Sequence, residues 1–375
     1  MKKFLAIAAS AVLAFGAVAL AACEDKQSDG SAENATYKQV DLSTAEKKSA
    51  FVDEVSSKMN VEKLFGDVNA DDFSVGLALD MNFNSEVSVS AKDFPVSPVA
   101  KKDLAASAKL NFDESLKVKV SEKDCLASSK TNLSFSAKLP DELMDMMGTP
   151  DGSPEWMTIV TSILSGVDYS IDSYLDNEYV YVKCPKSILE KLPEEAQGVL
   201  PESGKIKIPY SDLLNPTLPA IPEGYAAAPS ASLETAIIVE QVMDMLINYN
   251  VDIAVSTQNG YAVKLTAQKD ALLNILGDAT GDAQAVAMID QLATFNKCAI
   301  TAYLAVDNNG AFKEVSVKFD LDATIKIAAN LIQEGVPEIN GSIKLNTGIS
   351  VKKFDGKITL PSDLDSYVDI ISETE

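Results

Sequence analysis

The sequence contains no histidine and no arginine, so all 32 of its cationic side chains are lysines. Without histidine, the chain lacks the commonest general base and the commonest metal ligand, which excludes Ser–His–Asp and Cys–His catalysis and histidine-based zinc sites. Without arginine, planar bidentate recognition of phosphate or carboxylate is excluded too. We therefore expect no catalytic residue, no metal and no cofactor, with a hydrolase built on carboxylates or lysine as the remaining enzymatic alternative.

Acidic residues outnumber the lysines, and the 55 Asp and Glu residues give the chain a formal net charge of −23. A nucleic-acid-binding surface needs clustered cations that neutralise phosphates, so no nucleic acid is expected as a partner. The same acidity argues against a domain that lies flat on anionic lipid head groups. Its simplest interpretation is solubility outside the cell.

Cysteine is rare, and beyond the N-terminal segment the chain carries only Cys125, Cys184 and Cys298. An odd number allows one internal disulfide at most, and the spacing fits no metal motif. We expect three semi-buried thiols that act as small apolar groups. A Cys125–Cys184 bridge is the alternative, and the sequence alone leaves the disulfide state open.

The N-terminus has the pattern of a secretory signal, with Lys2 and Lys3 before an uncharged apolar run over 4–22. The run ends in Leu-Ala-Ala-Cys, which resembles the lipobox of bacterial lipoprotein precursors. The resemblance implies that residues 1–22 are a signal peptide and that Cys23 receives lipid, with fatty acyl chains such as palmitate. The protein would then be exported and anchored to the outer face of the cytoplasmic membrane or to the outer membrane. An uncleaved transmembrane anchor is the alternative, because the run nearly spans a bilayer.

Residues 23–42 are mostly polar and are expected to form a flexible tether. Residues 43–375 then form the folded part, either one domain or two modules, 43–213 and 231–375, that the Pro- and Ala-rich segment 214–230 joins.

Long alternating strands dominate the folded part. The Ser43–Glu46 segment resembles a capping box and predicts a helix that ends near Asn60. Apolar residues at every second position then predict half-buried strands joined by short polar turns. These strands cover 73–83 with a continuation to 91, 104–112, 116–120 and 133–139. Helices are expected at 140–148 and 154–165, strands at 167–175 and 179–184, a short helix at 186–193 and a strand at 205–210.

The C-terminal part has the same kind of pattern, with alternating strands joined by hairpins and helices between them. Asn259-Gly260 and Asn309-Gly310 lie between alternating runs and predict two hairpins. Helices are expected at 233–249 and 281–296, and further strands from 343 and at 357–360. Because consecutive strands are linked by hairpins, a doubly wound parallel sheet is excluded. The predicted class is therefore α+β with a large antiparallel sheet.

This order of elements, with Tyr179–Lys183 after a turn and the closing Ile358–Asp363 segment before Tyr367, resembles the lipoprotein-sorting superfamily of bacterial envelope proteins. The resemblance implies a strongly curved sheet, a half-barrel, with helices packed on its concave face around acyl chains. The residues expected to line the ligand are Leu77, Leu79, Met81, Ala106, Ala108, Leu110, Leu133, Phe135 and Ala137.

The function expected from these patterns is that of a membrane-anchored lipoprotein that binds a lipid or another hydrophobic ligand in the cell envelope. The alternative is a surface structural or interaction protein with a packed core and no ligand.

The other motifs in the sequence do not indicate a specific site. Acidic pairs such as Asp71-Asp72, Asp141-Glu142 and Glu194-Glu195 are interpreted as solvated, Asp307–Gly310 as a turn, and Met144, Met146 and Met147 as a packed helix face.

Overall fold

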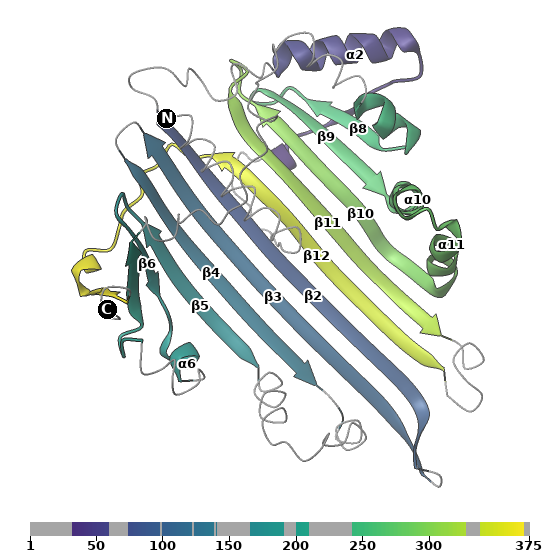
Figure 1. The fold of residues 1–375 in the computed structure, drawn as a ribbon. Helices are drawn as coiled ribbons and strands as arrows, with labels where there is room; N and C mark the ends of the chain where they lie inside the picture. The colour runs from purple at the N-terminus through teal and green to yellow at the C-terminus, as the bar shows by residue number, and fades with distance from the viewer. Residues whose placement is uncertain are drawn as a thin grey trace.

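The computed structural model describes residues 32–59, 74–97, 100–121, 124–138, 140, 166–190, 200–209, 242–327 and 338–370. They form one large, open sheet of 13 strands with few helices (Figure 1), in the order β1-β8-β9-β10-β11-β12-β2-β3-β4-β5-β6-β7-β13. Neighbouring strands are antiparallel except β7 and β13, which are parallel. The predicted large antiparallel sheet is thus confirmed in its main part, but the sheet is mixed at one edge.

The strands are β1 (Lys38–Gln39), β2 (Ser74–Ser97), β3 (Ala100–Ser121), β4 (Cys125–Lys138), β5 (Val167–Leu175), β6 (Tyr179–Lys183), β7 (Lys205–Pro209), β8 (Asp252–Ser256), β9 (Tyr261–Gln268), β10 (Ala293–Val306), β11 (Phe312–Ile327), β12 (Ile339–Lys353) and β13 (Val368–Asp369).

The sheet combines strands from both halves of the chain. Strand β12 pairs with β2 along its whole length, from Ile339 opposite Ala91 to Lys353 opposite Leu77. Figure 1 shows these strands, yellow and blue, side by side at the centre of the sheet. One continuous sheet therefore runs from β8 and β9 in the C-terminal half to β6 and β7 in the N-terminal half.

The strands give the sheet two chemically different faces, because paired residues share a face and successive residues alternate. Leu79 on β2 lies opposite Leu116 on β3 and Val351 on β12. We call the face that bears these side chains the apolar face. Its neighbour Asp80 lies opposite Ser115 and Ser350, and we call that side the polar face.

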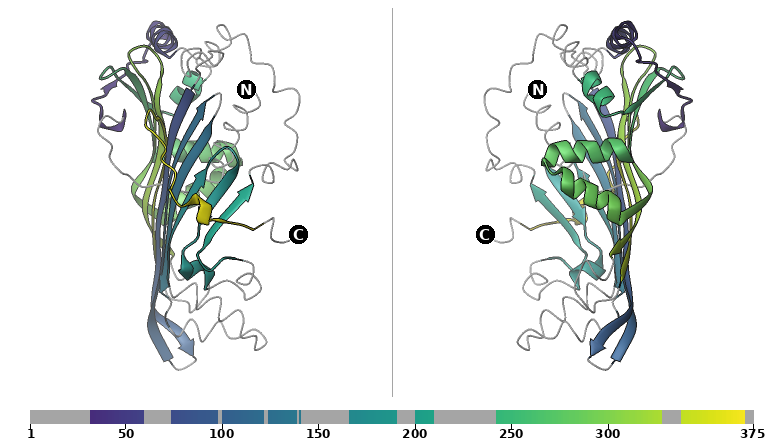
Figure 2. Two further views of the ribbon diagram at one scale, coloured as in Figure 1. Left: turned by 90° about the vertical axis from the view of Figure 1, so that its left-hand side faces the viewer. Right: turned by 90° about the vertical axis from the view of Figure 1, so that its right-hand side faces the viewer.

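The sheet is curved (Figure 2), and helices α2 (Ala45–Lys58), α10 (Lys269–Thr280) and α11 (Ala283–Leu292) lie at the β8–β11 side. The Thr44 side chain caps α2 by accepting a hydrogen bond from the Lys47 N–H at 3.3 Å. The predicted capping box is therefore shifted by one residue from Ser43. Phe51 of α2 is buried in a cluster with Ile253 and Val263, so α2 contributes to the core at this end of the sheet. The other helices among the described residues are short: η1 (Ala32–Asn34), α6 (Lys186–Leu189), η4 (Leu364–Ser366) and the helical residues 242–248.

One predicted helix is shorter than expected, and one helix was not predicted. The helix expected at 281–296 is α11, which ends at Leu292, and β10 already begins at Ala293. Helix α10 precedes it and was not predicted; the left-handed Gly281, with φ 67°, ends α10 and separates the two helices. The strand expected at 357–360 is irregular. Apart from residue 140, the predicted helices at 140–148 and 154–165 and the segment 214–230 lie outside the described residues.

The predicted hairpin turn at Asn259-Gly260 is confirmed. Both residues lie in the connection 257–260 between β8 and β9, and both have positive φ, 57° and 124°, a conformation that Asn and Gly adopt most readily. A Cβ atom on Gly260 would also lie 2.1 Å from the Val306 carbonyl oxygen. Backbone conformation and close packing therefore both require glycine at this position.

The two faces predict opposite responses to charge. Leu79 is 3% exposed on the apolar face, whereas its neighbour Asp80 is exposed on the polar face. Leu79→Asp should lower the free energy of unfolding by about 3 kcal/mol or more, because it buries an unpaired charge. Asp80→Lys should change it by less than about 1 kcal/mol. Equal urea-unfolding midpoints for the two variants would contradict the assignment of faces.

Candidate functional site

The residues predicted to line a ligand all lie on the apolar face of three adjacent strands, β2, β3 and β4. Leu110 pairs with Phe135, and Ala108 pairs with Ala137. Ala108 also lies opposite Val87 of β2. The register therefore combines the predicted positions into one surface, with the alanines together at one end.

Part of this surface is covered and part is accessible. Leu79 and Met81 are buried, whereas the other predicted positions, among them Ala108, Phe135 and Ala137, are half-buried. Val89, on the same face of β2, is 44% exposed. The accessible part thus lies around Val87 and Val89, because Ala91 and Leu104, which pair on the same face nearer the β2–β3 turn, are buried.

The apolar face continues across β12, β11 and β10, a region that sequence reasoning did not include. Leu304 pairs with Val315, and Val317 lies two residues farther on the same face of β11. These three side chains are 37%, 36% and 39% exposed. Their alternation was visible in the sequence, but their place beside the predicted residues depends on the pairing of β12 with β2. The candidate site is therefore a broad, partly open apolar surface.

Residues 32–37 cover part of the polar face of β10 and β11, where Tyr303, Glu314 and Ser316 are buried. The Ala32 N–H donates a hydrogen bond to Oε2 of Glu314 at 2.7 Å, and the Lys318 ammonium lies 2.6 Å from Oε1 of Glu33. The Tyr37 ring packs beside Tyr303, at 5.9 Å between centroids. Burial, with the neighbouring Tyr303 and Glu314, raises the pKa of Tyr37. The chain thus covers the polar face here, although the apolar side chains on the other side stay accessible.

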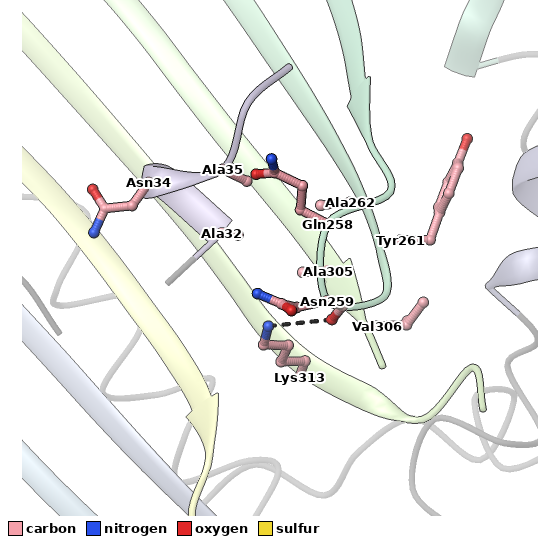
Figure 3. A pocket seen from close by; sticks show the side chains of 10 residues that line it. All are labelled: Ala32, Asn34, Ala35, Gln258, Asn259, Tyr261, Ala262, Ala305, Val306 and Lys313. Carbon is pink, nitrogen blue, oxygen red and sulfur yellow. Dashed lines mark hydrogen bonds between the residues drawn. The ribbon is translucent and has the colours of Figure 1, made fainter. Parts of the chain in front are cut away.

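A small pocket of about 200 Å³ lies beside this N-terminal segment (Figure 3). Its walls include Ala32, Gln258 and Ala262, and Lys313 donates a hydrogen bond to the Asn259 carbonyl at 3.4 Å. Lys313 is the one charged residue among its described lining residues. The described residues that line this pocket therefore contain no cluster of reactive groups.

The helices also present accessible apolar side chains. Met288 on α11 is 56% exposed, and Met245 in the helical residues 242–248 is 50% exposed. Met245 lines an open depression of about 500 Å³ with Tyr249 and Asp278, and the Tyr249 hydroxyl donates to the Asp278 carboxylate at 2.8 Å. Accessible apolar side chains are therefore present on the helices as well as on the sheet.

One acidic residue interrupts the apolar face. Glu114 of β3 lies opposite Met81 and Thr131, both on that face. The hydroxyls of Ser129 and Thr131 each donate a hydrogen bond to its carboxylate, one to Oε1 and one to Oε2. Sequence reasoning missed this group because its polar members break the alternation that identifies a strand.

The structure also describes the three cysteines and Asp307. Cys125, Cys184 and Cys298 are free, half-buried thiols, and burial raises the pKa of each. Asp307 accepts hydrogen bonds from the N–H groups of Asn309 and Ala311, which confirms its interpretation as a turn residue. Cys23, the acidic pairs and the methionines singled out from the sequence all lie outside the described residues.

The described residues carry neither a metal-binding cluster nor a membrane-spanning helix. The described part of the chain contains no cluster of three or more metal-ligating side chains. None of its helices has both the length and the apolar character needed to cross a bilayer. The sequence matches no protein-family model and is not significantly similar to any curated protein, so the resemblance to the lipoprotein-sorting superfamily stays a prediction.

The buried carboxylate of Glu314 is predicted to hold the N-terminal segment in place. Glu314→Ala removes the acceptor of the Ala32 N–H, and one unsatisfied buried donor costs about 1–3 kcal/mol. Urea unfolding should show a loss in this range, and hydrogen exchange should show faster exchange in residues 32–40. Glu86→Gln, which breaks an exposed ion pair with Lys109, should change stability by less than about 1 kcal/mol. Unchanged exchange in Glu314→Ala would contradict this role.

Proposed function

We propose that this protein is a lipid-anchored protein of the cell envelope that binds a lipid or another hydrophobic ligand on the apolar face of its sheet. The observation that carries the proposal is the accessibility of Leu304, Val315 and Val317, on strands whose polar face is buried nearby at Tyr303, Glu314 and Ser316. Contiguous apolar surface of more than a few hundred Å² is rare on monomers and marks binding sites. Acyl chains that cover it would gain about 25 cal/mol for each Å² removed from water.

In this proposal, helices form a second wall on the concave face of a half-barrel. Phe51 of α2 packs with Ile253 and Val263, which lie on the apolar face, and this contact supports the arrangement at one end. Helix α10 contacts β9 and β10, and α11 contacts β10 and β11. Figure 2 draws both helices on the side toward which β5 and β6 bend, which supports the same arrangement. Accessible Met288 of α11 would then contact the ligand opposite the sheet.

The anchor in this proposal is lipid on Cys23. Residues 24–31 separate it from Ala32, which the Glu314 carboxylate fixes on the polar face. An extended chain spans at most about 3.6 Å per residue, so Ala32 would lie within roughly 35 Å of the membrane surface. The membrane is accordingly the proposed partner, and the apolar face would exchange ligand close to it.

Cys23→Ser tests the anchor, because the thiol is the acyl acceptor. In the bacterial host, metabolic labelling with a fatty acid should give a labelled wild-type protein and an unlabelled variant, and the variant should leave the membrane fraction. A variant that is still labelled and membrane-bound would contradict lipidation at this residue.

Filling the accessible surface tests the ligand site. Ala108→Trp with Ala137→Trp introduces two large rings at directly paired positions of the apolar face. This double variant should lose most of its binding of N-phenylnaphthylamine, a neutral fluorescent apolar probe, while its melting temperature stays close to that of the wild type.

The matched control is Ala105→Trp with Ser136→Trp, at exposed positions of the polar face on the same two strands. It should bind the probe like the wild type. If the wild-type protein binds no such probe, the proposal fails, and the exposed apolar side chains are better explained as an interaction surface for another protein.

A further inference from the structure

The carboxylate of Glu114 occupies an unusual place. On β3 it follows Phe112 and precedes Leu116 at the alternate positions of the apolar face. The neighbouring acidic residues Asp80 and Asp113 lie on the polar face instead. A charged group on an apolar face is unfavourable unless it has hydrogen-bond partners.

The structure provides partners on the adjacent strand. Ser129 and Thr131 are successive residues of β4 on the apolar face, and their hydroxyls donate to the two carboxylate oxygens. A carboxylate offers about four acceptor positions, so two donors leave capacity for another. The cross-strand neighbours Met81 and Thr131 carry no charge. The two hydroxyls therefore orient the group, whereas its charge has no cation among these neighbours.

We infer that Glu114, oriented by Ser129 and Thr131, binds the head group of an amphiphile that carries a protonated amine. The inference rests on the proposed ligand site and specifies its ligand class. From Glu114 the apolar face extends along β3 to Ala108, about 20 Å at roughly 3.3 Å per residue. An ammonium at Glu114 would place its apolar chain along this path, over Leu110 and Phe135. A charge-assisted hydrogen bond at a partly desolvated carboxylate favours an amine over a carboxylic acid.

Three probes that share the same twelve-carbon chain and differ only in the head group test the inference: dodecylamine, dodecanol and dodecanoate. Each competes with N-phenylnaphthylamine at pH 7 and below its critical micelle concentration, where the amine is protonated and the acid is ionised. The wild-type protein should bind the amine about tenfold more tightly than the acid, as one charge-assisted hydrogen bond predicts. Glu114→Gln keeps the size and the acceptor oxygen but removes the charge, and it should abolish most of this preference.

Asp113→Asn is the matched control, because it removes the same charge from the adjacent residue on the opposite face. It should retain the tenfold preference, and both variants should keep the wild-type melting temperature. Ser129→Ala with Thr131→Val, which removes the orienting hydroxyls, should reduce the preference less than Glu114→Gln does.

Three results would overturn the inference and separate its failure from that of the proposed function. Equal competition by amine and acid in the wild-type protein would show an apolar site without head-group recognition. An equal loss of preference in Glu114→Gln and Asp113→Asn would assign it to the overall negative charge. If neither N-phenylnaphthylamine nor any dodecyl probe binds, the proposed ligand site itself fails.

Discussion

The pairing register of the long central strands is the constraint on which the rest of this structure depends. Along β12, β2, β3 and β4, each apolar residue lies opposite others of the same face, as Val351, Leu79 and Leu116 do. A shift of one residue in any of these pairs would move a whole row of apolar side chains to the other face. The register therefore creates one apolar surface many strands wide, and the remaining elements act mainly by covering one side of the sheet or the other.

The chain treats the two sides differently. Residues 32–37 cover the polar face of β10 and β11, where Glu314 is 3% exposed and accepts the Ala32 N–H. On the apolar side, α2 covers β8 and β9, but Leu304, Val315 and Val317 stay accessible. Burying the Glu314 carboxylate and Ser316 while leaving valines accessible is costly for a monomer in water, but suits a surface that a hydrophobic ligand covers. The proposed function follows from this arrangement, in which polar side chains are buried and apolar side chains are accessible.

Local patterns predicted much of the fold. The strand at 167–175, the hairpin at Asn259-Gly260 and the helix after Thr44 follow from alternation, turn residues and a cap. The pairing of β12 with β2 could not be predicted in this way. It joins residues about 250 positions apart in the sequence, and local patterns contain no information about which distant strands pair. The Glu114 cluster shows a second limit. Its polar side chains on the apolar face divided the predicted β3 near residue 114 and shortened the predicted β4 to begin at residue 133, so Glu114, Ser129 and Thr131 fell outside the predicted strands.

The central claim is that the apolar face holds a hydrophobic ligand. Its most direct test is mass spectrometry of the exported, unanchored Cys23→Ser protein, purified without detergent and examined both in its native state and after organic extraction. The account predicts a complex heavier than the chain by the mass of a lipid, with about one lipid recovered per protein molecule. A native mass equal to that of the chain alone, with no lipid in the extract, would contradict it.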